Sequence, residues 1–302
     1  MRRYIEKITK LLRVSKDLES LKVLTGRSLL EARRGRRPES LQDMEFKVFS
    51  QFGDDGIIQY LIDKCEMENK TFIEFGVENY TESNTRFLLL NNNWRGLVID
   101  GGAENISYIK NDDISWRHDL TAELAFITRD NINEIIKKAG FAGKAGILSV
   151  DVDGNDYWIW DAITVVDPEI VILEYNSVFG KEHAVTIPYQ KDFYRTKAHY
   201  SNLYWGASLR ALVELSASKG FVFLGCNSSG NNAYFVKKGK LGDIKQVSVD
   251  TAFIDGRFSE SRNSAGGLSY LRGSARLREI STCEIYNCGT RRNVKIQELY
   301  RL

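Results

Sequence analysis

The sequence has few of the residues that build covalent or metal-bound frameworks. Its 302 residues include four scattered cysteines with no CxxC pair. This spacing predicts neither a zinc site nor a disulfide framework, and it favours a reducing compartment. We therefore expect a cytoplasmic protein. Its hydrophobic content of 43% is enough for an ordinary buried core.

Long apolar runs and a strong charge excess are also absent. The longest runs fall well short of the roughly 20 residues that cross a bilayer, so no membrane span is predicted. Near the start, Glu6, Lys7 and Lys10 interrupt what would be the apolar region of a signal peptide, and we expect no secretion. A net charge of +2 without an RNA-binding or zinc-finger pattern predicts no nucleic-acid partner.

Residues 1–44 have the pattern of a basic amphipathic helical extension. Apolar residues recur at helical spacing from Ile5 to Leu24, and the basic cluster RRGRR occupies 33–37. One interpretation is that residues 1–38 bind a protein partner or an anionic membrane, which would place the protein peripherally at the inner membrane face. The other interpretation is a helix packed on its own domain with a solvated charged face. We favour this one, because runs of charged residues are usually just solvated.

From residue 45 onward, short apolar runs alternate with amphipathic stretches. TFIEFG, RGLVID, AGILSVDVD and PEIVILEYN read as strands, with helical patterns between them. This alternation predicts an α/β fold with a mostly parallel sheet and helices on both faces. Two later runs, FVFLGCN and NNAYFVKKG, are joined by a short loop and should pair antiparallel. We expect a main domain at 45–239 and a polar C-terminal cap or appendage at 240–302 that folds back over the sheet.

Each of these four predicted strands ends in an acid. Glu74, Asp100, Asp151 and Glu174 stand at or near these ends. Ligands of open parallel sheets bind beyond the carboxyl ends of the strands. No GxGxxG follows the first strand, which argues against a nicotinamide dinucleotide. Asp100 follows Gly76 by about 25 residues, where an acid that binds ribose hydroxyls is expected, so a ribose without a pyrophosphate fits best.

Five segments carry a resemblance to a known family: FIEFGVENYTESNTRFLL, WRGLVIDGG, ILSVDVDGNDYWIW, PEIVILEYN and YWGASLRALVELSASKGFVFLGCNSSGNNAYFV. Together they resemble the FkbM-like class I S-adenosylmethionine-dependent methyltransferases and their bacterial relatives, over residues 45–238. The resemblance implies a Rossmann-like class I methyltransferase sheet with a terminal antiparallel strand. It also implies S-adenosylmethionine as cofactor and O-methylation of a sugar, glycan or other small hydroxylated acceptor, in polysaccharide biosynthesis.

The resemblance also implies a cofactor site. Glu74 and Gly76 would line the methionine and ribose side, Asp100 would hold the ribose hydroxyls, and His118 or Asp119 would lie near the adenine. The usual glycine-rich turn is reduced here to Gly76. The cofactor residues we expect are Glu74, Gly76, Ser83, Asn84, Asp100, Gly101, His118 and Asp119.

Methyl transfer to an alcohol needs a base that removes the hydroxyl proton. Asp151 and Asp153 are the expected catalytic residues, because carboxylates at the end of a buried strand are costly unless used. His183 and His199 are the alternatives. Asp156 is expected at a helix N-terminus. Hard oxygen ligands for Mg²⁺ are a separate hypothesis, with Asp151, Asp153, Glu174 and Asn176 as the ligand set.

Two other functions stay open. The first is a non-catalytic glycan- or nucleotide-binding module that kept the fold and lost turnover. The second is an NAD-dependent sugar enzyme, against which the missing GxGxxG argues.

Overall fold

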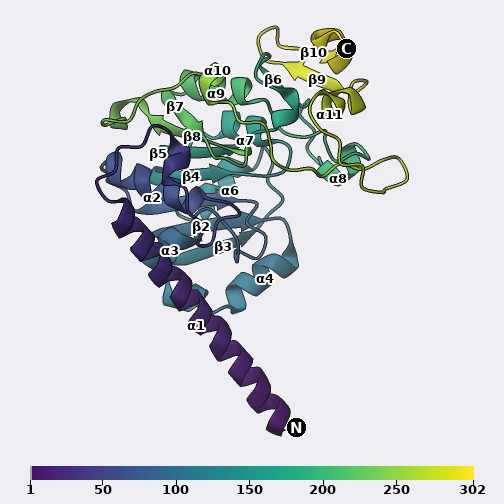
Figure 1. The fold of residues 1–302 in the computed structure, drawn as a ribbon. Coiled ribbons are helices and arrows are strands. Elements are labelled where there is room, and N and C mark those ends of the chain that lie inside the picture. Colours follow the sequence, from purple (N-terminus) through teal and green to yellow (C-terminus); the bar gives the residue numbers. More distant parts are fainter. Residues whose placement is uncertain (1) are drawn as a thin grey trace.

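A seven-stranded sheet forms the centre of the computed structural model, which describes residues 2–302 (Figure 1). The strand order is β3-β2-β1-β4-β5-β8-β7. Neighbours from β3 to β5 pair in parallel, whereas β8 runs antiparallel to both β5 and β7. The predicted α/β fold with a mostly parallel sheet is confirmed. The strands are β1 (Thr71–Phe75), β2 (Arg95–Asp100), β3 (Leu120–Leu124), β4 (Gly143–Val150), β5 (Val166–Glu174), β7 (Phe221–Cys226) and β8 (Asn232–Lys237).

The last strand of this sheet in sequence lies inside it and not at its edge. After β7, the chain turns within five residues and inserts β8 between β5 and β7. The register places Asn232, at the start of β8, opposite Glu174, at the end of β5. The β7–β8 hairpin therefore brings its turn to the carboxyl end of the parallel strands.

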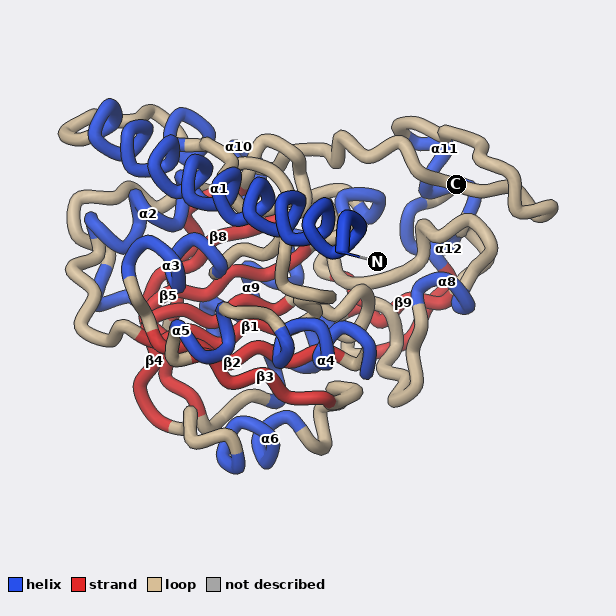
Figure 2. Tube along the Cα trace, turned by 90° about the horizontal axis from the view of Figure 1, so that it is seen from below, coloured by secondary structure: helices blue, strands red, loops and turns tan. Residues whose placement is uncertain are grey.

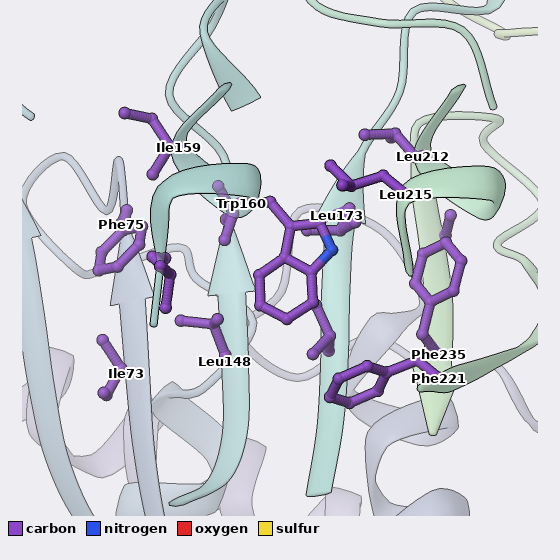
Figure 3. Packing of buried hydrophobic residues seen from close by; sticks show 14 of the residues in the cluster. Ile73, Phe75, Leu148, Ile159, Trp160, Leu173, Leu212, Leu215, Phe221 and Phe235 are labelled. Carbon is purple, nitrogen blue, oxygen red and sulfur yellow. The ribbon is translucent and has the colours of Figure 1, made fainter. Parts of the chain in front are cut away.

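Apolar layers cover both faces of the sheet. Along β1, Ile73 and Phe75 join one cluster while Phe72 joins the other, as the alternation of side chains in a strand requires. Figure 3 shows the first cluster, in which Trp160 of α7 lies over the strands. The indole N–H of Trp160 donates to Ser216 Oγ of α9 at 3.1 Å. Burial on both faces explains why these strands read as continuous apolar runs.

Helices of moderate length connect the strands. Ser208 caps α9, since its side chain accepts a hydrogen bond from the amide of Ala211, and Gly220 follows the helix with a φ of +87°. The apolar spacing over 204–220 predicts one helix, whereas in the structure the helix begins at Leu209 and the residues before it form a loop. The helices are α2 (Asp54–Lys64), α3 (Arg86–Asn92), α4 (Ala103–Asn111), α5 (Ile114–Arg117), α6 (Ile132–Lys138), α7 (Asp156–Ala162), α9 (Leu209–Ser218) and α10 (Val249–Ala252). Short 3-10 turns occupy Leu41–Met44, Ser177–Phe179 and Lys238–Lys240.

The N-terminal extension forms one long helix, α1 (Arg2–Arg33), which runs past α3 on one face of the molecule (Figures 1 and 2). Its second half packs on the domain: Val23 and Leu30 contact a cluster that contains Val48 and Phe87. A Cβ at Gly26 would lie 2.6 Å from the Phe87 ring, so the two helices approach closely there. Within residues 2–302, none of the helices is long and apolar enough to cross a membrane.

The C-terminal segment builds a small second layer at the carboxyl edge of the main sheet. Strands β9 (Glu284–Asn287) and β10 (Arg292–Lys295) form a three-stranded sheet with β6 (Val185–Thr186). Its core joins Trp205 and Phe179 of the preceding loops to Ile280 and Ile285. Residues 249–254 pack on the main core, and the chain after them covers this edge. The remaining helices are α8 (Arg195–Ala198), α11 (Ser274–Glu279) and α12 (Ile296–Tyr300).

Candidate functional site

A cavity of about 1230 Å³ runs along the carboxyl ends of β1, β2, β4 and β5. Its floor is formed by the strand-end residues, and the loops after α8 and α10 form its far wall. Sites in open α/β sheets lie at this edge. The volume exceeds that of a typical site for one drug-sized ligand, so a nucleoside cofactor and an acceptor can be held together.

Glu74 organises the loop that follows β1. Its Oε1 accepts from the amide of Asn84 at 2.8 Å, and its Oε2 accepts from the amide of Thr85 at 3.0 Å. Burial raises the pKa of Glu74, against the lowering effect of these bonds. Glu74 thus shapes the loop over residues 76–85, and Ser83 and Asn84 line the cavity with it, as expected. The side-chain Nδ2 of Asn84 donates to Ser149 Oγ at 3.2 Å, which ties the loop to β4.

Gly76 is held where no side chain fits. Its φ is +69°, and a Cβ there would lie 1.8 Å from the carbonyl oxygen of Asp151. The turn after β1 and the turn after β4 are therefore in direct contact. Farther along the same loop, Glu78 and Tyr80 have φ values of +47° and +63°, a left-handed conformation that costs non-glycine residues free energy. These two residues stand where small ones would be expected in a glycine-rich turn.

Asp100 closes the other side of this half of the cavity. Its Oδ2 accepts from the amide of Glu78 at 2.8 Å, and its Oδ1 accepts from the amide of Gly102 at 2.7 Å and from the side chain of Asn105 at 3.0 Å. Asp100 and Gly101 both line the cavity, beside Glu78 and Asn105. The carboxylate is thus oriented by fixed donors, and its remaining lone pairs are placed to accept from vicinal hydroxyls.

His118 and Asp119, which are expected beside the adenine, do not line the cavity. The carbonyl of Asp119 accepts from the amide of Gly96, and the side chain of Asp119 lies 3.5 Å from that of Arg95. Both contacts are at the amino ends of β2 and β3, at the opposite edge of the sheet from the cavity. Ala125, Phe126 and Ile127, directly after β3, line the cavity in their place.

The position of these two residues has a local cause in the sequence. The segment 120–124 forms a strand that no apolar run marks, because only Ala122 among its five residues is buried. The carboxyl end of β3 is therefore at Leu124, and His118 precedes the amino end of that strand. The apolar residues Phe126 and Ile127, just after this short strand, are the feature of the sequence that could have indicated an apolar wall of the cavity.

Two carboxyl groups face each other at the ends of β4 and β5. Burial raises the pKa values of Asp151 and Glu174 well above their usual range. The carboxylate of Asp151 raises the pKa of Glu174 further. The carboxylates of Asp153 and Asp156 raise the pKa of Asp151 further, while a hydrogen bond with Glu174 lowers it. Glu174 Oε2 is buried and receives no hydrogen bond from an N–H or hydroxyl group within residues 2–302. The pair is therefore suited to share a proton, and both residues line the cavity.

Asp156 supports this pair from the start of α7. Its two carboxylate oxygens accept from the amides of Val152 and Gly154 at 2.8 and 2.9 Å, which holds the turn after β4. Burial raises the pKa of Asp156 to about 6. The expected helix N-terminal position of Asp156 is confirmed.

Asp153 is separated from Asp151 by the turn. Its φ is +53°, its side chain is 63% exposed, and its Oδ1 accepts from Arg195 Nη1 at 2.9 Å. The guanidinium of Arg195 also lies over the ring of Trp205, with its carbon 4.6 Å from the centroid. Asp153, Arg195 and Trp205 all line the cavity. Asp153 therefore belongs to the rim where an acceptor would enter.

Neither candidate histidine lines the cavity. The ring of His183 lies against the ring of Tyr300, with centroids 4.8 Å apart, in the small C-terminal layer. His199 shares a hydrogen bond with Ser201 Oγ at 2.8 Å, and burial lowers its pKa. The residues around His199 reach the cavity through Tyr200 and Asn202 instead.

The carboxylates that could hold a cation differ from the predicted set. Oxygens of Asp151, Asp156 and Glu174 lie within 4.8 Å of one another. Asn176 is unsuited as a ligand, because its amide donates to the carbonyls of Leu203 and Trp205 and its oxygen accepts from Val178. The exposed Asp153 is outside the group. A cation or a shared proton would equally relieve the repulsion among these three carboxylates.

The sequence matches no protein-family model and no curated protein. Several solved structures share the general arrangement at low identity. An S-adenosylmethionine-dependent methyltransferase from Clostridium acetobutylicum is 11% identical, with a TM-score of 0.37 over 61% of this chain and 90% of that one. An O-methyltransferase from Bacillus cereus in complex with SAH is 12% identical, with a TM-score of 0.41 over 69% and 95%. The CurJ carbon methyltransferase is 12% identical, with a TM-score of 0.40 over 76% and 70%. At these values the likeness assigns the chain to no family.

Proposed function

We propose that this protein is an S-adenosylmethionine-dependent methyltransferase that methylates a hydroxyl group of a sugar or glycan precursor. The observation that carries the proposal is the shared cavity of two unlike halves. One half is organised by Gly76 and by Asp100, whose carboxylate is fixed by backbone donors. The other contains the Asp151–Glu174 pair, which is poised to accept a proton.

The cofactor half fits a nucleoside. Asp100 offers oriented oxygens to ribose hydroxyls, and Phe126 with Ile127 offers an apolar wall for a base. Gly76 and the turn after β4 bring the backbone close to the centre of the cavity. When bound, S-adenosylmethionine supplies an electrophilic methyl group on sulfur, and the positive charge there suits a site rich in carboxylates.

The acceptor half fits an alcohol. To accept a methyl group from the bound cofactor, the hydroxyl would have to be held in an aligned position and would have to lose its proton. The Asp151–Glu174 pair would take that proton, so that the balanced products are a methyl ether, the demethylated cofactor and one protonated carboxyl group. A raised pKa brings the pKa of the base closer to the pH at which the enzyme works, which favours proton transfer.

The rim fits a polar ring. Trp205 presents an aromatic surface, while Arg195, Asp153 and Asn202 offer hydrogen-bond donors and acceptors around it. Sugars combine apolar ring faces with hydroxyls, so an aromatic surface bordered by polar groups suits them.

A non-catalytic binding module is the second candidate. The observation that favours it is the left-handed backbone of Glu78 and Tyr80, two large residues in the loop that would bend around the cofactor. Such a loop could hold a ligand without turnover.

Calorimetric titration with S-adenosylmethionine and its demethylated product separates these functions. We expect both to bind, and we expect release of the demethylated product in the presence of sugar or nucleotide-sugar acceptors. Absence of binding at millimolar ligand would sink the methyltransferase proposal. Binding without methyl transfer to any acceptor would favour the module.

A further inference from the structure

Four apolar side chains form an exposed stripe on α1. Val14, Leu18, Leu21 and Leu24 are 46–56% exposed. Their spacing of four, three and three residues places them along one side of the helix. An apolar stripe over three turns of a surface helix, open to solvent, is the pattern of a face that another surface covers.

The opposite side of the helix is fixed to the domain. Lys16 pairs with Asp113 of α5, Glu19 pairs with Arg86 of α3, and Arg27 donates to Asn91 at 2.7 Å. These contacts and the packing of Val23 prevent α1 from rolling its stripe onto the protein. The stripe is therefore held outward, and Figure 2 shows the helix lying on the outside of the molecule.

Positive charge is concentrated in the same segment. Residues 1–38 carry twelve of the 42 Lys and Arg residues but four of the 40 Asp and Glu residues, which is a net charge of +8. The remaining residues 39–302 then carry a net charge of −6. A chain near neutrality overall is thus strongly polarised, with its cationic end on the helix that bears the stripe.

An exposed tryptophan lies close to the same helix. Trp116 of α5 is 72% exposed, and the guanidinium of Arg117 lies over its ring. Arg117 pairs with Asp113, the residue that also receives Lys16 of α1. Tryptophan beside basic residues is enriched where proteins meet the headgroup region of a bilayer.

A second copy of the chain suits this stripe poorly. Two copies joined along this helix would bring together two segments that each carry a net charge of +8, and these charges repel. An anionic surface satisfies both the apolar stripe and the charge.

We infer that α1 docks the protein on an anionic lipid bilayer, lying in the headgroup region with the Val14–Leu24 stripe toward the acyl chains. Basic residues near the surface are attracted to the anionic headgroups. The inference is independent of the proposed methyl transfer, because it rests on α1, and among residues 2–302 those that line the cavity begin only at Gln51.

Vesicle flotation of the full-length protein tests this inference. The protein should float with vesicles that contain phosphatidylglycerol and stay behind with pure phosphatidylcholine, and high salt should weaken the binding. The double variant Leu18→Ser/Leu21→Ser should reduce the bound fraction roughly tenfold. Arg36→Glu/Arg37→Glu should weaken binding to anionic vesicles, since both residues are exposed.

Matched controls keep the outcome clear. Leu268→Ser removes an equally exposed leucine from the C-terminal segment and should leave flotation unchanged. Circular dichroism of the Leu18→Ser/Leu21→Ser variant should match the parent, because both side chains point to solvent. The inference is overturned by equal binding to neutral and anionic vesicles, or by no binding to either. It is also overturned if the leucine variant abolishes dimerisation in sedimentation, or if nucleic acid but not lipid binds residues 1–38.

Discussion

A Cβ placed on Gly76 would lie 1.8 Å from the carbonyl oxygen of Asp151, so the turn after β1 and the turn after β4 touch through a position that only glycine can occupy. This contact links the two halves of the cavity. The loop that orients Asp100 through Glu78 and the turn that carries Asp151 cannot move independently.

Gly76→Ala should therefore lower stability and abolish binding of the demethylated cofactor product. The added methyl group meets backbone and not a flexible side chain, and the positive φ alone costs about 1–3 kcal/mol. Gly220→Ala is the matched control, since its φ is +87° but a Cβ there meets nothing within 4 Å. The control should lose a small amount of thermal stability and keep binding. Equal effects of the two variants would contradict the contact.

Asp100→Ala should weaken binding of the demethylated product by at least tenfold, because two or more hydroxyl contacts are lost and a charged acceptor contributes about 1.5–3 kcal/mol per bond. Asp119→Ala is the control at the opposite edge of the sheet and should change the dissociation constant little. Calorimetry measures both. A larger effect of Asp119→Ala would instead support the expected position of Asp119 beside the adenine.

Asp151→Asn and Glu174→Gln should reduce kcat by roughly 10²–10⁴-fold, the contribution of a positioned base. Cofactor affinity should change much less. Asp161→Asn, an exposed carboxylate on α7, serves as control. Normal turnover in both site variants would remove the pair from the mechanism.

Asp153→Asn should act mainly on KM for the acceptor, because Asp153 lies on the rim and pairs with Arg195. Steady-state kinetics of Asp153→Asn beside Asp151→Asn measure this difference. A loss of kcat in Asp153→Asn equal to that in Asp151→Asn would return Asp153 to the proton-accepting role.

The buried carboxyl groups of Asp151, Glu174 and Asp156 should make the folded protein less stable as the pH rises. Because burial raises the pKa values of Asp151, Glu174 and Asp156 in the folded state, the folded protein binds more protons than the unfolded chain above pH 4. The stabilisation present below the unfolded pKa is lost as the pH rises, through about 6 for Asp156. Asp151→Asn should therefore raise Tm relative to the parent at pH 8 and not at pH 4. Thermal unfolding at both pH values checks this sign.

A divalent cation would relieve the same repulsion. If the group of Asp151, Asp156 and Glu174 holds one, then chelation should lower Tm at pH 8 and Mg²⁺ should restore it, and Asp156→Asn should remove this response. The readout needs no activity. An identical melting curve with chelator and with Mg²⁺ would assign the cluster to proton transfer alone.

Much of the architecture follows from local patterns in the sequence. The strands β1, β2, β4 and β5 are buried on both faces, so each shows as an apolar run, and the short loop before β8 required an antiparallel pair. The strand β3 was missed because it lies at the edge of the sheet, where few of its side chains are buried. The small C-terminal sheet could not be predicted either, because its strands are four residues long or shorter and carry many polar residues.

The sequence by itself determined that acids stand at the carboxyl ends of the strands, because that order is written along the chain. Only the tertiary structure decided which acids meet. Asp151 and Asp153 are two residues apart, yet a left-handed turn sends them to different surroundings. Glu174 lies 23 residues from Asp151 in sequence, yet β4 and β5 pair in parallel and bring the two carboxyl groups together. The physical reason is that strand pairing and burial depend on packing by distant segments, and burial is the largest cause of the raised pKa values of that pair.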